Sequence, residues 1–187
     1  MQFKEDPEIK SKFNPEEGEL IKERTGFMSL KSKEFFLKED EVSDKLGILK
    51  SGLMRTFVYD DEGEEVTTQF FEPGNLILSA DSFNNKTKAQ ENIAAIIDSE
   101  LLINTYDDMM FLYEKIPHWK NICLGIADRK NDQALERMKD FQTLSASQRY
   151  LKFCDEHPEI IKFAPLKHIA SYLGIDIATL SRIRKKV

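Results

Sequence analysis

The chain has 187 residues, of which 41% are hydrophobic, and a net charge of -6 at pH 7. This length suits one large or two small domains, and the composition indicates a packed core and excludes a disordered chain. Residues 143–187 hold eight basic and four acidic residues, so they carry +4 and the first 142 residues carry -10. An acidic body with a basic end is typical of a regulator that touches nucleic acid with one domain.

Cysteine usage and hydropathy indicate the compartment. Cys123 and Cys154 are isolated and lack the spacing of metal ligands, so free thiols in a reducing cytoplasm are expected. No apolar stretch approaches the roughly 18 residues of a membrane span, and no signal-peptide pattern opens the chain. We therefore expect a cytoplasmic protein with no membrane partner.

From about residue 26 to residue 105 the pattern is that of short strands separated by turns. The expected strands are Lys33–Lys38, Leu46–Lys50, Leu53–Tyr59, Glu65–Phe71, Leu76–Ser79 and Asn92–Asn104. Ser51-Gly52 reads as one of the turns, and Asp60–Glu64 as the turn of a hairpin. Short strands with regularly spaced turns predict a double-stranded β-helix, or jelly roll, within an N-terminal domain of residues 1–116.

Tyr106–Ile116 reads as a short helix, and residues 117–142 read as a long helix that connects the β domain to the rest of the chain. The apolar positions of the long helix are Trp119, Ile122, Ile126, Leu135, Met138 and Phe141. The polar stretch Asp128–Gln133 interrupts them. The helix is therefore either the seam of a homodimer or a helix packed only on its own β domain.

Residues 143–187 predict a helical domain that ends in a helix-turn-helix, which makes the overall fold class α+β. The residues that fit the spacing of this motif are Ile169, Ala170, Leu173, Gly174, Ile175, Leu180 and Ile183. Gly174 can adopt the left-handed conformation that ends the first helix. Asp176 can cap the second helix by accepting from the backbone N–H of Ala178 or Thr179.

The outer face of the second helix carries Ala178, Ser181, Arg182 and Lys185, at the spacing of side chains that enter a major groove together. This pattern predicts double-stranded DNA as the partner. A surface helical hairpin with a basic end is the alternative interpretation.

From about Gly26 onward the chain resembles Crp/Fnr-type transcription regulators, in the short form of the Bacteroidetes kind. The resemblance rests on Leu46–Tyr59 (LGILKSGLMRTFVY), Phe71–Asn75 (FEPGN) and Ile169–Lys186 (IASYLGIDIATLSRIRKK). It implies a sensor barrel, a dimerisation helix and a helix-turn-helix. It also implies a homodimer on a pseudo-palindromic operator, with RNA polymerase as a further partner.

In the recognition helix of this family, a Glu commonly precedes a Thr-x-Ser-Arg run. Thr179, Ser181 and Arg182 match that run, and Ala178 occupies the Glu position. The resemblance therefore implies that these four residues read bases, Arg182 through guanine and Ala178 through an apolar contact such as a thymine methyl. The residues expected to meet phosphates are Lys167, His168, Arg184, Lys185 and Lys186.

Cyclic-nucleotide binding in this family uses a Glu for the ribose and an Arg for the cyclic phosphate. Aligned from Pro73-Gly74, Ser79 falls at the Glu position and Gln90 at the Arg position. A buried phosphodiester needs a paired, hydrogen-bonding cation, so we expect no cyclic AMP binding. An unidentified small effector, or none, is expected, and a cyclic-nucleotide-responsive regulator is the alternative. The residues expected around an effector are Ser79, Ala80, Gln90 and Glu91.

No cofactor, metal site or catalytic activity is expected. An iron–sulfur sensor needs about four thiolates, and a haem sensor would have only His118 and Cys123 as nearby axial ligands. All three histidines lie beyond the expected strands, where they cannot serve a metal-dependent oxygenase barrel. No nucleophile motif or phosphate-cradling glycine loop is present. A small-molecule-binding regulatory module without specific DNA binding remains the alternative from another class.

Overall fold

The computed structural model describes residues 13–186, apart from the side chains of residues 124 and 126–133. Its strands are β1 (Gly26–Leu30), β2 (Phe35–Leu37), β3 (Lys45–Tyr59), β4 (Glu65–Phe71), β5 (Leu76–Ile77) and β6 (Asn92–Thr105). Its helices are α2 (Pro15–Glu23), α3 (Ala80–Asn85), α4 (Tyr106–Lys115), α5 (Trp119–Thr143), α6 (Ala146–Glu156), α7 (Pro158–Phe163), α8 (Leu166–Tyr172) and α9 (Ile177–Arg184).

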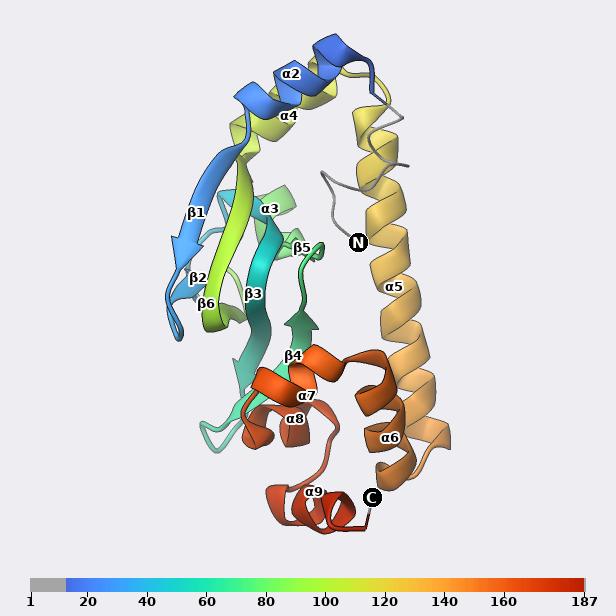
Figure 1. Ribbon diagram of the computed structural model, residues 1–187. Helices are drawn as coiled ribbons and strands as arrows, with labels where there is room; N and C mark the ends of the chain where they lie inside the picture. Colours follow the sequence, from blue (N-terminus) through green and yellow to red (C-terminus); the bar gives the residue numbers. More distant parts are fainter. Residues whose placement is uncertain (1–12, 187) are drawn as a thin grey trace.

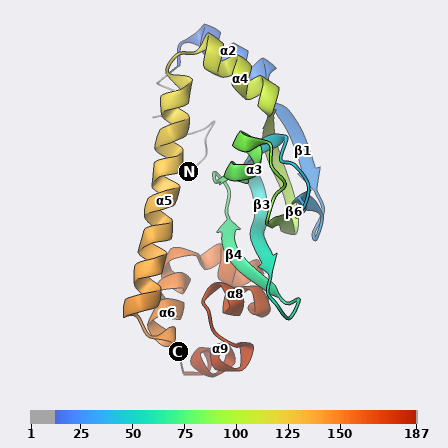
Figure 2. The ribbon, with the colours of Figure 1, turned by 180° about the vertical axis from the view of Figure 1, so that it is seen from behind.

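The strands form one side of the molecule and the long helix α5 runs along the other (Figure 1). Helices α2 and α4 lie at one end, and α6 to α9 lie at the opposite end, beside the far ends of β3 and β4 (Figure 1). The view from behind gives the same arrangement (Figure 2). Helix α5 therefore spans the distance between the two ends, as expected of a connecting helix.

The strands pair in antiparallel fashion. Strand β6 lies between β1 and β3, β4 pairs with β3, and the short strands β2 and β5 pair with β6 and β3. The predicted hairpin is confirmed, because the N–H of Asp60 donates to the carbonyl of Glu64, and Gly63 supplies a φ of 81° between them. The turn thus sets the register of β3 against β4.

The expected turn at Ser51-Gly52 is wrong, because β3 runs through it as a single strand. The pairing of β3 with β6 shifts register around Ser51, and Gly52 has a φ of 102°. A Cβ on Gly52 would lie 2.6 Å from the carbonyl oxygen of Asp98. The glycine therefore marks an irregularity inside a strand, where the backbone of a neighbour comes close.

Three elements lie where the sequence predicted none. Helix α2 lies in the charged N-terminal segment, and its start has a capping box: Asn14 Oδ1 accepts from the N–H of Glu17 at 2.9 Å, and Glu17 Oε2 accepts from the N–H of Asn14 at 3.0 Å. Strand β1 pairs with β6, and α3 follows the short strand β5. Helix α3 ends at Lys86, which has a φ of 57°.

Two apolar clusters stabilise the sheet and the helices α4 and α5 beside it. The sheet encloses one cluster, in which Leu49, Met54, Ile77, Ile93 and Leu101 are fully buried. The second joins α4 to the start of α5 through Met109, Leu112, Ile116 and Trp119. The predicted short helix is confirmed as α4, and its apolar face attaches α5 to the sheet domain.

The expected connecting helix, residues 117–142, is confirmed in place by α5, although the polar stretch 128–133 lies outside the described side chains. The expected helical domain of residues 143–187 is made of α6, α7, α8 and α9. The domain boundaries 1–116, 117–142 and 143–187 remain predictions. Across the described residues, no helix combines the length and apolar character needed to span a bilayer.

Candidate nucleic-acid interface

Helices α8 and α9 and the turn between them form the predicted helix-turn-helix. Gly174 has a φ of 64°, and the N–H of Ile175 donates back to the carbonyl of Ala170 at 3.0 Å. A Cβ on Gly174 would lie 2.7 Å from Cε1 of Phe141, on α5. Both the backbone conformation and the close approach of Phe141 therefore require glycine here.

The predicted cap of α9 is confirmed. Asp176 Oδ1 accepts from the backbone N–H of Thr179 at 2.8 Å, and the Thr179 hydroxyl donates to Asp176 Oδ2 at 2.7 Å. Both hydrogen bonds lower the pKa of Asp176, and the bond from the Thr179 side chain has the larger effect. The start of α9 is thus fixed by one ionised carboxylate.

The expected inner face of the motif is buried. Ile169, Ala170 and Leu180 are at most 1% exposed, and Leu173 and Ile183 are 5% and 7% exposed. These side chains share one apolar cluster. The burial leaves the opposite face of α9 to solvent.

That outer face carries the expected groove-entering residues. Ala178, Arg182 and Lys185 are exposed, and Ser181 is half-buried. Arg182 Nε donates to the carbonyl of Ala178 at 3.3 Å, and Nη2 donates to Oγ1 of Thr179 at 2.9 Å. One Nη2 proton and both Nη1 protons remain, so the terminal edge of the guanidinium can still make a bidentate contact.

Most of the residues expected to meet phosphates are on the surface. Arg184, Lys185 and Lys186 are exposed. Lys167 is also exposed, although its Nζ lies 3.9 Å from Oε2 of Glu65 on β4.

His168 is not on the surface, so the expectation that it meets phosphate is wrong for this arrangement. Its residue is 8% exposed, because α8 packs this side chain toward β4. Burial, followed by the charges of Arg55 and Lys167, lowers the pKa of His168 to about 4. A neutral, buried imidazole provides no charge for a phosphate, and no local sequence signal separates it from an exposed one.

The C-terminal helices are docked on the β domain of the same chain, which the sequence did not predict. The apolar cluster of the helix-turn-helix includes Leu53 and Phe70 from β3 and β4. The N–H of Thr67 donates to the hydroxyl of Ser171 at 3.0 Å, and His157 Nδ1 lies 2.7 Å from Oε2 of Glu72. Apolar and polar contacts together attach α7 and α8 to the end of β4.

The expected effector residues are not among those that line the pocket along the segment between β2 and β3. Ser79 is buried as the N-cap of α3, Ala80 is exposed in its first turn, and Gln90 and Glu91 precede β6. Among the described residues, no hydrogen bond joins one of these four to another. The sensor site therefore remains a prediction.

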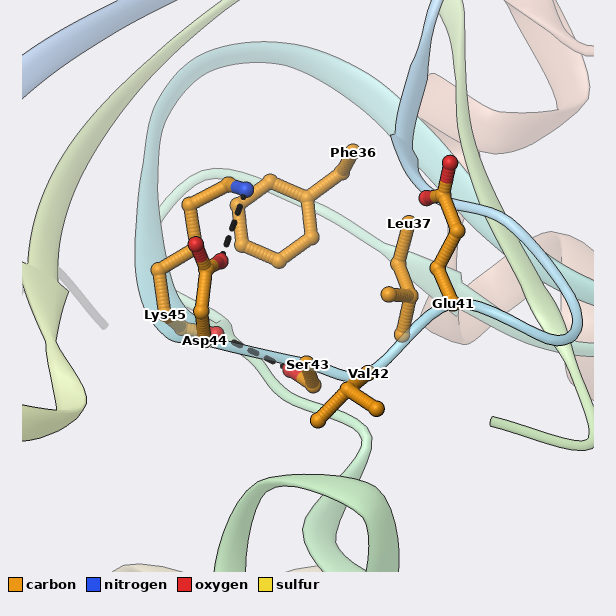
Figure 3. A pocket seen from close by; sticks show the side chains of 7 residues that line it. All are labelled: Phe36, Leu37, Glu41, Val42, Ser43, Asp44 and Lys45. Carbon is orange, nitrogen blue, oxygen red and sulfur yellow. Dashed lines mark hydrogen bonds and ion pairs between the residues drawn. The ribbon is translucent and has the colours of Figure 1, made fainter. Parts of the chain in front are cut away.

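A pocket of about 230 Å³ opens elsewhere in the β domain, along the segment between β2 and β3 (Figure 3). It is lined by Phe36, Leu37, Glu41, Val42, Ser43, Asp44 and Lys45. Nζ of Lys45 is 3.1 Å from Oδ1 of Asp44, so its charge is already paired, and Glu41 adds a second carboxylate. This lining is unfavourable for an anionic phosphodiester.

Within the described part of the chain, no observation points to a metal site or to a nucleophilic cysteine. No group of three or more His, Cys, Asp or Glu side chains there is placed to hold a metal ion. Cys123 is half-buried against Tyr113, and burial raises the pKa of its thiol, which makes it a poor nucleophile at neutral pH.

Comparison with known proteins places the fold. Residues 27–115 match the family model described as Cyclic nucleotide-binding domain. The c-di-GMP responsive global regulator CLP from Xanthomonas campestris superposes with a TM-score of 0.71 at 13% identity, over 92% of this chain and 91% of that chain. FixK2 from Bradyrhizobium japonicum gives 0.73 at 17% identity, over 87% and 83%. A chain from Eubacterium rectale assigned to the crp/fnr family of transcriptional regulators gives 0.73 at 18% identity, over 95% and 85%.

No curated protein matches the sequence. At these identities the structural likeness establishes the fold, which is that of the Crp/Fnr regulators, with an antiparallel β-sandwich of the cyclic nucleotide-binding kind and C-terminal helices. The family resemblance and the fold class inferred from the sequence are thereby confirmed.

Proposed function

We propose that this chain, which has the fold of the Crp/Fnr regulators, is a cytoplasmic transcription regulator that binds a specific DNA sequence. The observation that carries the proposal is the two-sided character of α9. Its inner face is buried through Leu180 and Ile183, while its outer face presents Arg182 to solvent. A helix held in this way can enter a major groove without rearranging the domain. We assign the chain no catalytic role.

Three residues of α9 contact the bases, and a fourth positions one of them. Arg182 donates to O6 and N7 of a guanine through the free edge of its guanidinium. Ala178 makes an apolar contact, and Ser181 donates to or accepts from a base. Thr179 acts by positioning, because its hydroxyl already lies between Asp176 and Arg182.

The basic residues around α9 contribute affinity for DNA that does not depend on the base sequence. Arg184, Lys185 and Lys186 meet phosphates, and Lys167 joins them if it leaves Glu65. His168 takes no part while it is buried.

The partner in DNA binding is a second copy of the chain, docked through α5. Leu135 and Met138 lie about one turn apart on this helix and are 59% and 55% exposed, whereas Arg137 and Phe141 point toward the helix-turn-helix. Two chains paired along that exposed face would present two α9 helices to a pseudo-palindromic operator, with half-sites about one DNA turn apart. RNA polymerase is the expected further partner in transcription.

The β domain acts as the sensor, and its effector is not cyclic AMP. Gln90 is exposed and uncharged at the position where the resemblance requires a phosphate-binding Arg. The match of residues 27–115 to the cyclic nucleotide-binding domain favours a second candidate, a regulator responsive to another nucleotide messenger. CLP, of similar fold, is described as c-di-GMP responsive, which makes this dinucleotide the first one to test.

Selection of operator DNA from a random pool, followed by fluorescence anisotropy at fixed salt, tests the proposal. We expect a pseudo-palindrome, and we expect Arg182→Ala to lose the preference for one base per half-site, about 1–3 kcal/mol of discrimination. Lys120→Ala, an exposed cation at the other end of α5, is the control and should bind as wild type does. Failure to enrich any sequence would refute specific DNA binding. Cyclic AMP and c-di-GMP added to the same titration test the sensor.

A further inference from the structure

One large apolar side chain of α9 faces solvent and does not pack in the core. Ile177, the first residue of the helix, is 51% exposed, whereas Leu180 and Ile183 are 0% and 7% exposed. The partly buried Ile175, two residues earlier, belongs to the apolar cluster of the motif, and Ile177 does not. Packing within the domain therefore does not account for an isoleucine at this position.

The place of Ile177 in the helix points to the DNA. It directly follows the cap residue Asp176 and precedes the exposed Ala178. In helix-turn-helix proteins the N-terminal residues of the recognition helix contact the base edges. The same helix and its end carry Arg182, Arg184, Lys185 and Lys186, all exposed, so the surface around Ile177 is complementary to a polyanion.

The chemistry of the major groove leaves one matching group. Base edges there present hydrogen-bond donors and acceptors, and the apolar exception is the C5 methyl of thymine. An isoleucine cannot pair with a donor or an acceptor, so next to those groups it would leave them desolvated and unsatisfied. Next to a thymine methyl it buries apolar surface on both partners.

We propose that Ile177 is a specificity-determining residue that packs on the methyl group of a thymine in each operator half-site. This inference rests on the proposed function and extends it, because it assigns a base to a residue outside the expected reading set. Arg182 then reads guanine through hydrogen bonds, while Ile177 reads thymine through an apolar contact.

Deoxyuridine provides the test, because it differs from thymidine only by that methyl. In the selected operator, each thymine is replaced in turn, and the dissociation constant is measured by anisotropy at fixed salt. For the wild type we expect one position per half-site at which the replacement weakens binding by about fourfold, the factor given by burial of one methyl group. Ile177→Ala should bind the two operators equally at that position.

Two further variants make the result specific. Phe163→Ala removes a side chain of similar exposure, 42%, from α7, and it should keep the full discrimination between thymine and uracil. Ala178→Gly tests the neighbouring apolar residue. Alanine is a better helix former than isoleucine, so Ile177→Ala is not expected to unfold α9, and circular dichroism checks this.

The outcomes separate the two proposals. If an operator is enriched but no thymine methyl matters, or Ile177→Ala still distinguishes thymine from uracil, the role of Ile177 is overturned and specific DNA binding stands. If Ala178→Gly alone abolishes the discrimination, the methyl is read by Ala178 and the role of Ile177 is likewise overturned. If no operator is enriched, both proposals fall.

Discussion

Arg137 on α5 ties three elements together, and its removal is the most informative perturbation of the fold. Nη1 donates to the carbonyl of Thr68 on β4, and Nη2 donates at 2.8 Å to the carbonyl of Tyr172, at the end of α8. The guanidinium carbon lies 3.9 Å from the centre of the Tyr172 ring. We predict that Arg137→Met, which keeps an apolar stem and removes the donors, loosens the contact between the helix-turn-helix and the β domain.

The size of the effect follows from these contacts. Each hydrogen bond from a charged donor contributes about 1.5–3 kcal/mol, so the two together contribute about 3–6 kcal/mol. Burial of the cation, which lowers the pKa of Arg137, offsets part of this gain. The Nε atom is buried and has no hydrogen-bond partner, which adds to the offset. We expect a net loss of about 2–4 kcal/mol in the free energy of unfolding, since two carbonyls lose their partner.

Urea denaturation followed by circular dichroism measures that loss. Lys139→Met makes the same kind of change at an exposed position on the same helix, two residues away, and should stay within about 0.5 kcal/mol of wild type. Limited proteolysis between α7 and α8 reports separately whether the contact has opened. If Arg137→Met unfolds at the same urea concentration as wild type and resists proteolysis equally, the three-way tie contributes nothing and the reasoning is refuted.

Three other perturbations have defined outcomes. Because the folded-state pKa of His168 is about 4, below its ordinary 6.5, the unfolded chain takes up the proton first as the pH falls through this window. The free energy of unfolding should then fall by up to about 3 kcal/mol, and His168→Gln should flatten that slope in urea titrations at pH 7 and 4.5. Gly174→Ala should lower the free energy of unfolding by about 1–3 kcal/mol in thermal unfolding, because alanine disfavours the left-handed backbone and its Cβ displaces Phe141. Gly18→Ala is the control: it has open space around it and should stabilise α2 by about 0.5–1 kcal/mol. Lys185→Gln should reduce the slope of log affinity against log salt by about 1 per half-site, with base preference unchanged.

The helix-turn-helix was predictable because its determinants are local. The cap Asp176, the turn glycine Gly174 and the inner residues Leu180 and Ile183 all lie within one short segment. Each acts through its own backbone or through a neighbour three or four residues away. The hairpin at Asp60–Glu64 and helix α4 were predictable for the same reason. The capping box of α2 was equally local, and its Asn-x-x-Glu pattern with Pro15 was present in the sequence.

The errors came from contacts between distant segments. Gly52 reads as a turn until the backbone of Asp98 is placed beside it, and His168 reads as a surface residue until α8 is placed on β4. The effector residues were aligned by a motif and stay a prediction, whereas the pocket of about 230 Å³ is lined by another segment. Arg137 gave no signal, because its partners are backbone carbonyls, which every sequence possesses.

These distant contacts also set the direction in which α9 faces. Two neighbouring helices hold the helix-turn-helix: Phe141 of α5 packs on Gly174, and Arg149 of α6 donates to the carbonyl of Leu173 at 3.1 Å. The Arg149 guanidinium lies 4.9 Å from the Phe141 ring centre, so the two contacts adjoin. Arg137 joins the same end of α5 to β4. The β domain therefore packs on α8 and leaves the outer face of α9 free. In a dimer formed along α5, these contacts would fix the angle between each α9 and the dimer axis. A change at β4 would then pass through Arg137 to α5 and alter the spacing of the two α9 helices. The outer residues of α9 would not themselves have to change.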